Sequence, residues 1–219
     1  MIRQLLKKLT HPILKYGTQK WSSKPRLYTY EDIEVIVMPD VFPPHYTIST
    51  KILLDYIKPL DIKDKTLLEL GCGSGIVALY AAKKEAIVTA SDINNVALKA
   101  LEKAAKKNSL ELAILNSNLF NKLSQLSFDY IIINPPYYPK TPKNIKEQAW
   151  FCGENFEYFK SLFLQLSNRN DKNILMILSQ DCDIQKIKNI ASLNHFQLDI
   201  ELERTRFNEK NFIFKVSKI

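Results

Sequence analysis

The sequence predicts an α/β protein built on a doubly wound, mainly parallel sheet of seven strands, because short apolar runs alternate with longer helical patterns from Thr66 onward. The parallel strands are expected at residues 66–70, 87–92, 111–116, 128–134 and 173–179. Parallel neighbours need crossover connections, and the helical patterns supply most of them. The last two runs, residues 196–204 and 211–217, have only a short connection between them, which predicts an antiparallel hairpin at the sheet edge.

Helices are expected where apolar residues recur at helical spacing, over residues 75–84, 95–107, 155–166 and 183–193. Ahead of the sheet, residues 31–38 alternate and predict a strand, and the rigid turn Asp40-Val41-Phe42-Pro43-Pro44 follows it. A further helix is expected from about Ser49 to Ile57, with Ser49 or Thr50 as its N-cap. We therefore predict a short N-terminal helical and strand extension, residues 1–45, in front of a main domain at residues 46–219.

The basic charge of the chain is concentrated at its N-terminus. Of 31 basic and 23 acidic residues, seven basic and no acidic ones lie in residues 1–26, so the rest of the chain has a net charge of only +1. Apolar residues recur at helical spacing in this arm, and Pro12 should end or kink the helix; they are Ile2, Leu5, Leu6, Leu9 and Ile13. Three interpretations stay open: a helix docked on the body, a contact to nucleic acid, or a helix on a membrane surface.

The composition is that of an ordinary globular protein, with 46% hydrophobic and 25% charged residues. No apolar run approaches the ~18 residues that span a membrane, and the N-terminus lacks the apolar core of a signal peptide. Cys72, Cys152 and Cys182 are far apart, and the three histidines share no ligand spacing. We therefore expect a cytoplasmic protein with neither a metal site nor a disulfide framework.

A glycine-rich loop closes the strand at residues 66–70. Glu69 precedes Gly71, Gly73 and Gly75, and glycines at alternate positions let the backbone turn tightly and approach a ligand closely. The loop leads into a helix, and the next strand ends about twenty residues later in Asp92, where a carboxylate can hold a ribose. A plain helix cap is the alternative role for Asp92.

The tetrad Asn134-Pro135-Pro136-Tyr137 follows directly after the apolar strand at residues 128–134. Two prolines make the turn stiff and remove backbone N–H groups, so the turn presents carbonyl oxygens without competing donors. The Asn134 side-chain oxygen and the Pro135 carbonyl can accept both hydrogens of a substrate –NH₂, and Tyr137 offers a face for stacking. The alternative is a turn that only ends a strand.

The loop, the acid and the tetrad, in this order, resemble the class I S-adenosylmethionine-dependent methyltransferases of the Rossmann-like fold. Residues 147–155, soon after the tetrad, look like the same segment of the HemK-like, or methyltransferase small-domain, enzymes, which methylate glutamine side-chain amides. Residues 40–44 together with Thr50 resemble the segment that this family places over the cofactor. The resemblance covers residues 40–160. It departs from the family pattern at Tyr138, where an aliphatic residue is usual, and at the lone Gly153.

The resemblance implies S-adenosyl-L-methionine as cofactor, no metal, and a set of site residues. Asn118 occupies the position where the family usually has an acid near the adenine amino group, and Ile93 would lie against the adenine ring. Catalysis is assigned to Asn134, Pro135 and Tyr137. The cofactor contacts are assigned to Glu69, Gly71, Gly73, Gly75, Asp92, Ile93, Asn118, Leu119, Asn134 and Thr50.

The implied reaction is methyl transfer to a planar amide or amino nitrogen, by orientation and electrostatics without a strong base. The substrate favoured by the segment after the tetrad is a glutamine side chain in a protein, such as a translation factor or a ribosomal component. The alternatives are an exocyclic amino group (adenine) of RNA or DNA held through residues 1–26, a small molecule, and a non-enzymatic scaffold that only binds the cofactor.

Overall fold

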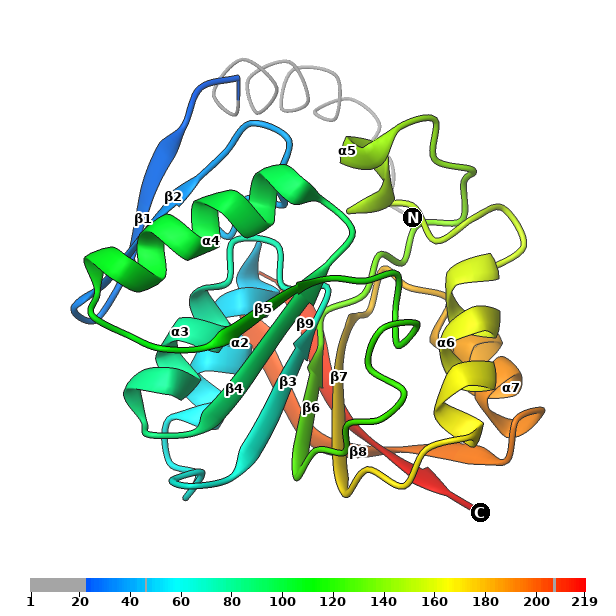
Figure 1. Ribbon diagram of the computed structural model, residues 1–219. Coiled ribbons are helices and arrows are strands. Elements are labelled where there is room, and N and C mark those ends of the chain that lie inside the picture. The colour runs from blue at the N-terminus through cyan, green and yellow to red at the C-terminus, as the bar shows by residue number, and fades with distance from the viewer. Residues whose placement is uncertain (1–22, 46, 207) are drawn as a thin grey trace.

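The computed structural model describes residues 23–45, 47–206 and 208–219, and its centre is a seven-stranded sheet (Figure 1). The strand order is β5-β4-β3-β6-β7-β9-β8. The first five pair in parallel, and β9 is antiparallel to both β7 and β8. The strands are β3 (Thr66–Leu70), β4 (Ile87–Asp92), β5 (Ala113–Asn116), β6 (Tyr130–Ile133), β7 (Asn173–Ser179), β8 (Phe196–Arg206) and β9 (Glu209–Lys218). The predicted doubly wound sheet with a closing hairpin is confirmed.

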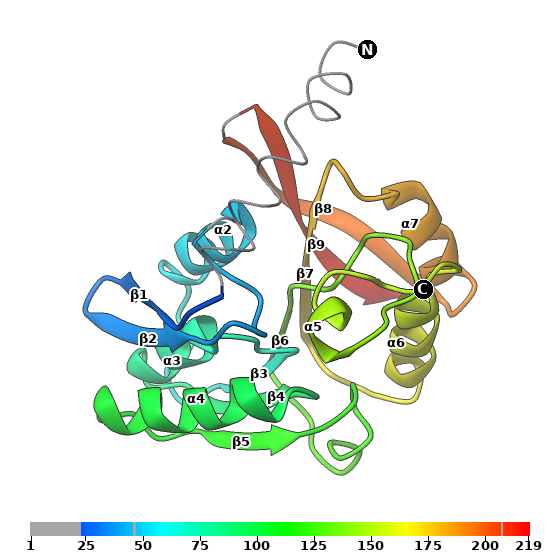
Figure 2. The same ribbon diagram turned by 90° about the horizontal axis from the view of Figure 1, so that it is seen from above.

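Helices cover both faces of this sheet because its central strands are apolar on both sides. One face is packed against α2, α3 and α4, and the other against α6 and α7, so the core consists of two clusters separated by the sheet. The helices are α2 (Ile48–Ile57), α3 (Ile76–Lys83), α4 (Asn95–Lys107), α5 (Ile145–Gln148), α6 (Glu157–Ser167) and α7 (Ile184–Ser192). Seen from above, the β8–β9 hairpin projects beyond the rest of the sheet (Figure 2).

The chain order of the strands reverses between β3 and β6. From β3 the chain moves outward through β4 to β5, and it then returns to form β6 on the other side of β3. In such sheets a crevice opens at this reversal, beyond the carboxyl ends of the strands. The glycine loop follows β3, Asp92 ends β4 and Asn134 follows β6, so all three features lie at the edge where a ligand is expected.

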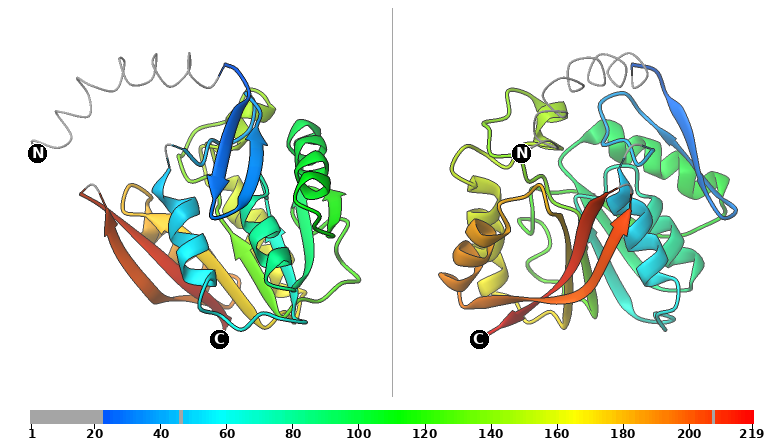
Figure 3. Two further views of the ribbon diagram at one scale, coloured as in Figure 1. Left: turned by 90° about the vertical axis from the view of Figure 1, so that its left-hand side faces the viewer. Right: turned by 180° about the vertical axis from the view of Figure 1, so that it is seen from behind.

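The N-terminal extension contains a strand that the sequence analysis missed. β1 (Arg26–Tyr30) and β2 (Ile33–Val37) form a separate antiparallel hairpin, which lies between α2 and α4 in the left view of Figure 3. The strand expected at 31–38 corresponds to β2. Its buried side chains join the core cluster that α2, α3 and α4 share. The division of the chain at residue 45 stays a prediction.

The arm helix predicted around Ile2 to Ile13 lies outside the described residues. Within the described part of the chain, no helix is long and apolar enough to cross a membrane. The three cysteines are unpaired and buried.

Candidate functional site

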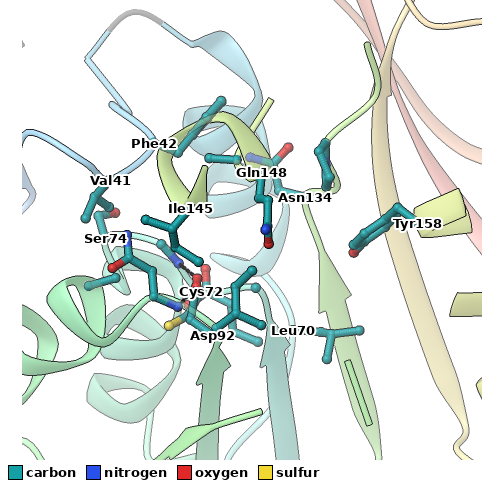
Figure 4. A pocket seen from close by; sticks show the side chains of 18 of the residues that line it. Val41, Phe42, Leu70, Cys72, Ser74, Asp92, Asn134, Ile145, Gln148 and Tyr158 are labelled. Carbon is teal, nitrogen blue, oxygen red and sulfur yellow. Dashed lines mark hydrogen bonds between the residues drawn. The ribbon is translucent and has the colours of Figure 1, made fainter. Parts of the chain in front are cut away.

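A cavity of about 270 Å³ lies beyond the carboxyl ends of β3, β4 and β6. Its floor is formed by the residues that follow these strands, and its roof by residues 40–42 and by α5. Figure 4 shows Phe42, Ile145 and Gln148 on one side of the cavity, and Cys72 and Asp92 on the other. The lining therefore comes from three parts of the chain: the segment that begins at residue 40, the glycine loop with Asp92, and the loop after the tetrad. The family resemblance linked the first two of these to the cofactor.

The glycine loop needs glycine at all three positions, since Gly71, Gly73 and Gly75 have φ values of 73°, 51° and 71°. A Cβ added at Gly75 would lie 2.4 Å from the Leu101 side chain, so this glycine lets α3 begin close against α4. A Cβ at Gly71 would meet no atom within 4 Å. Because Gly71 also lines the cavity, this position leaves room for a ligand to approach the backbone.

Asp92 connects the glycine loop to the end of β4. Its Oδ2 accepts a hydrogen bond from the Gly73 amide at 2.8 Å, and its Oδ1 accepts one from the Asn94 amide at 2.8 Å. Burial raises the pKa of this carboxyl, and the amide hydrogen bonds oppose that rise. Each carboxylate oxygen can accept a further hydrogen bond, so the group can hold both hydroxyls of a ribose.

The alternative role of Asp92 as a helix cap is wrong. The N-cap of α4 is Asn94, whose side-chain oxygen accepts from the Val96 amide at 2.9 Å. Asp92 lies on the cavity wall instead and shares that wall with Ile93. Asn118 and Leu119, which follow β5, line the cavity as well. The assignment of these residues to the adenine end of a cofactor stays a prediction.

Glu69 lines the cavity but also has a clear structural role. Its Oε2 accepts a hydrogen bond from the Ala78 amide of α3 at 2.8 Å, and the residue is only 8% exposed. This bond satisfies a backbone donor in the first turn of the helix, which has no side-chain cap at Gly75. The pKa of Glu69 is raised to about 8, mainly by burial; the hydrogen bond from the Ala78 amide opposes the rise and the nearby Asp92 adds to it. At neutral pH the group is therefore mostly protonated in this structure.

Asn134 is held in the cavity by a residue from a distant part of the chain. Its Nδ2 donates to the Ser49 hydroxyl at 3.3 Å, and Ser49 lies buried in the first turn of α2. With the amide nitrogen directed at Ser49, Oδ1 is left to accept from a ligand. The prediction of Ser49 or Thr50 as N-cap is wrong: α2 is preceded by Thr47, and both residues face inward.

The other members of the tetrad occupy different environments. Pro136 lines the cavity, whereas Pro135 and Tyr137 lie outside its wall. Among the described residues, no backbone amide donates to the Pro135 carbonyl, which keeps this oxygen available. The Tyr137 ring lies against that of Tyr138, with centroids 4.8 Å apart. The proposed stacking of a substrate on Tyr137 stays a prediction.

The segment after the tetrad folds back to roof the cavity. The backbone amide of Tyr138 donates to the Trp150 carbonyl at 3.1 Å, and the backbone carbonyl of Tyr138 accepts from the Cys152 amide at 3.0 Å. These two hydrogen bonds close a loop that contains α5. The Trp150 ring packs against Phe42, with centroids 4.7 Å apart. The segment at 40–44 and the loop after the tetrad thus meet above the cavity, although more than a hundred residues separate them in the chain.

Several cavity residues were not assigned to the site from the sequence, namely Ser117, Ile145, Gln148 and Tyr158, and Ser49, which holds Asn134, was expected only as a helix cap. The Tyr158 side chain is directed toward the cavity in Figure 4, and burial raises the pKa of its hydroxyl. None of these residues belongs to a motif with a characteristic spacing, so only the fold reveals them. Among the described residues, no cluster of His, Cys, Asp or Glu could hold a metal ion.

The profile of the methyltransferase small domain family matches residues 32–150, more than half of the chain, including the roof segment, the glycine loop, Asp92 and the tetrad. This chain belongs to the methyltransferase small domain family. The family resemblance predicted from the sequence is therefore confirmed. The match ends within the loop that follows the tetrad, so it does not cover α6, α7 or the β8–β9 hairpin.

Individual relatives and solved structures agree with this assignment. A protein of Methanocaldococcus jannaschii, provisionally named protein N5-glutamine methyltransferase, is 37% identical over 111 residues, which are 50% of this chain and 53% of that protein. Ribosomal RNA small subunit methyltransferase C of Photorhabdus laumondii is 31% identical over 134 residues, 59% of this chain and 37% of that enzyme. This chain thus spans about half or less of the length of these two relatives.

The solved structure of the E. cuniculi Mtq2–Trm112 complex, responsible for methylation of the eRF1 translation termination factor, matches with a TM-score of 0.63 at 19% identity. The match covers 82% of this chain and 99% of that one. At this identity the likeness demonstrates a common fold, and it extends to the region beyond residue 150.

Proposed function

We propose that this chain is an S-adenosyl-L-methionine-dependent N-methyltransferase that acts on a planar amide or amino nitrogen. The observation that carries the proposal is Asn134, whose amide nitrogen is held by Ser49 while its oxygen remains available beside the cavity. An oxygen acceptor fixed at this place is suited to an –NH₂ substrate, because it orients the nitrogen and favours positive charge that develops on it.

The residues around the cavity fit the proposed cofactor. The carboxylate of Asp92 supplies acceptors for two ribose hydroxyls, and the open space at the Cβ position of Gly71 admits a ligand against the backbone. Ile93 and Leu119 add apolar surface for a flat ring. When bound, S-adenosyl-L-methionine supplies an electrophilic methyl group on a sulfonium. The side chains of this protein then bind the cofactor, orient the substrate and exclude water.

An amide nitrogen is a weak nucleophile because its lone pair is delocalised, so orientation must supply much of the rate. In our proposal the Asn134 side-chain oxygen and the Pro135 carbonyl each accept one hydrogen of the substrate –NH₂. The ring of Tyr137 limits the plane in which the substrate lies. The roof formed by Phe42 and Trp150 excludes water from the cavity.

The substrate that we favour is the side chain of a protein glutamine. Support comes from the relative in M. jannaschii and from the fold shared with the complex that methylates a translation termination factor. We accordingly propose a translation factor or a ribosomal component as protein partner, and the cytoplasm as location.

The second candidate is an exocyclic amino group of RNA. The observation that favours it is the 31% identity to a ribosomal RNA methyltransferase, together with the basic residues at 1–26. A base would have to leave its stack before it could reach Asn134.

One experiment separates the two candidates and tests the activity itself. Purified protein is incubated with cell extract and S-adenosyl-L-methionine carrying a labelled methyl group, and the labelled material is then digested with protease or with nuclease. Label released by protease and recovered as N5-methylglutamine supports the first candidate; label released only by nuclease supports the second. The Asn134→Ala variant is the control, and equal labelling by this variant would contradict the assigned role of the tetrad.

A further inference from the structure

A second hollow, of about 480 Å³, lies between the β1–β2 hairpin and α4. Its walls are almost entirely apolar, from Leu27, Ile36 and Met38 of the hairpin side and from Val96 and Ala100 of the helix. We call it the hairpin groove. It is distinct from the cavity at the strand ends, because the two share no lining residue.

The hairpin groove exposes large apolar side chains that the fold leaves uncovered. Leu27 is 51% exposed, Ile36 is 44% exposed and Val96 is 41% exposed. Leu27 and Ile36 lie directly opposite each other in the hairpin, and Val96 faces them from α4. Scattered exposed apolar residues are common, but several that line one hollow indicate a binding surface.

Hydrogen bonds at both ends keep the hairpin groove open. Near the start of α4, Asn94 Nδ2 donates to the Asp40 carbonyl at 2.9 Å. At the end of α4, Asn108 accepts from the Glu34 amide at 3.1 Å and donates to the Glu34 carbonyl at 2.8 Å. The helix and the hairpin are thus fixed to each other on either side of the hollow, so a ligand would meet a preformed site.

Lysines form the rim of the hairpin groove on the helix side. Lys99, Lys103 and Lys107 follow at intervals of four residues, which places them on one face of α4. Lys107 pairs with Glu34. No ion pair is found for Lys99 or Lys103 within residues 23–45, 47–206 and 208–219. The rim therefore offers positive charge above an aliphatic floor.

We propose that the hairpin groove binds an acidic amphipathic segment of another protein. Its apolar side chains would cover Leu27, Ile36 and Val96, and its carboxylates would face Lys99 and Lys103. The arm of this chain is the wrong occupant, because residues 1–22 carry five basic and no acidic residues and would place like charges against the rim. RNA fits poorly as well, because the lining contains no aromatic ring or arginine on which a base could stack.

The inference does not depend on the proposed methyl transfer, since binding at the hairpin groove can be measured without cofactor. The groove and the cavity do share α4: its N-cap Asn94 and its residue Ala97 line the cavity, while Val96 and Ala100 line the groove. A bound segment would therefore lie beside the site without entering it.

The test uses the full chain and a short helical peptide with glutamates on one face and leucines on the other, labelled with an uncharged fluorophore. Fluorescence anisotropy should show saturable binding. The double variant Lys99→Glu/Lys103→Glu should weaken it ~10-fold or more, because two attractive contacts become repulsive. Ile36→Ser should also weaken binding of the peptide, because apolar contact is lost. An unchanged thermal midpoint of this variant would show that its fold is intact. The matched control Lys106→Glu/Lys122→Glu makes the same change in net charge at exposed positions outside the groove and should bind as the parent does.

Three results would overturn the proposal. The first is equal affinity of the peptide for the parent and the Lys99→Glu/Lys103→Glu variant. The second is equally tight binding of a peptide in which lysines replace the glutamates. The third is displacement of the acidic peptide from the parent protein by single-stranded RNA but not by unlabelled acidic peptide, which would assign the rim to nucleic acid.

Discussion

Glu69 gives the sharpest prediction about this structure, because its carboxyl is buried and its pKa is raised to about 8 from an ordinary value of 4.5. A raised pKa means that folding favours the protonated form. This contribution to stability is fully present below about pH 4.5, falls as pH rises while only the unfolded state ionises, and is lost once the pH passes about 8. The difference between the two pKa values corresponds to about 5 kcal/mol across this range.

The Glu69→Gln variant removes the ionisation and keeps an oxygen that can accept from the Ala78 amide. We expect its free energy of unfolding to lack the dependence on pH that Glu69 causes. As pH rises from about 5 to 8, the free energy of unfolding of the variant should therefore increase relative to that of the parent by up to ~1.4 kcal/mol for each pH unit.

Urea denaturation of both proteins at each pH from 5 to 9 measures this difference, and groups that titrate alike in both proteins cancel. Asp92 interacts with Glu69, so its own titration differs between the two proteins and does not cancel fully. This shifts slightly the pH at which the difference in unfolding free energy is half complete. Glu102→Gln on the exposed face of α4 is the matched control for the same chemical change at a site outside the core. A Glu69→Gln difference that stays constant between pH 5 and 8 would refute the reasoning.

Four further predictions concern the site and the arm. Asp92→Ala should weaken binding of S-adenosyl-L-methionine at least ~10-fold in calorimetry, because charge-assisted hydrogen bonds are lost, and unchanged affinity would remove Asp92 from the site. Asn134→Ala should lower kcat by a factor on the order of 10²–10³ with little change in cofactor affinity, whereas near-normal turnover would reduce the tetrad to a turn. Ser49→Ala should lower kcat by roughly 5–10-fold through loss of one neutral hydrogen bond, with cofactor affinity kept, and a pure effect on stability would contradict the positioning role. If residues 1–26 bind nucleic acid, the affinity should fall as the salt concentration rises, with a log–log slope approaching ~0.9 per phosphate contacted on duplex DNA, and deletion of the arm should flatten that slope. If the arm instead docks on the body, its deletion should lower the thermal stability of the protein and leave the affinity for nucleic acid unchanged.

Local patterns in the sequence were enough to place most elements of the domain. β3, β4, β7 and α4 begin and end at the residues expected, since their apolar spacing and flanking residues are unambiguous. β1 was missed because none of its side chains is fully buried and its strand conformation depends on pairing with β2. α5, a single turn, was missed because so short a helix carries no periodic signal.

The candidate site divides in the same way. Gly71, Asp92 and Asn134 could be placed at the cavity from sequence because each lies at the carboxyl end of an apolar strand, and the ends of parallel strands meet at one edge of the sheet. The structural role of Glu69 could not, because its acceptor function depends on how α3 starts against β3.

The sequence by itself therefore determined the order of most strands and helices, the edge of the sheet where the cavity lies, and the family. These properties follow from periodicity and from the backbone preferences of glycine and proline, which act over a few residues. Only the tertiary structure decided which residue orients Asn134, since Ser49 lies 85 positions away in the chain. It also decided the contact of Phe42 with Trp150 and the existence of the hairpin groove, because both arise where segments remote in sequence come together and no local pattern encodes such a meeting.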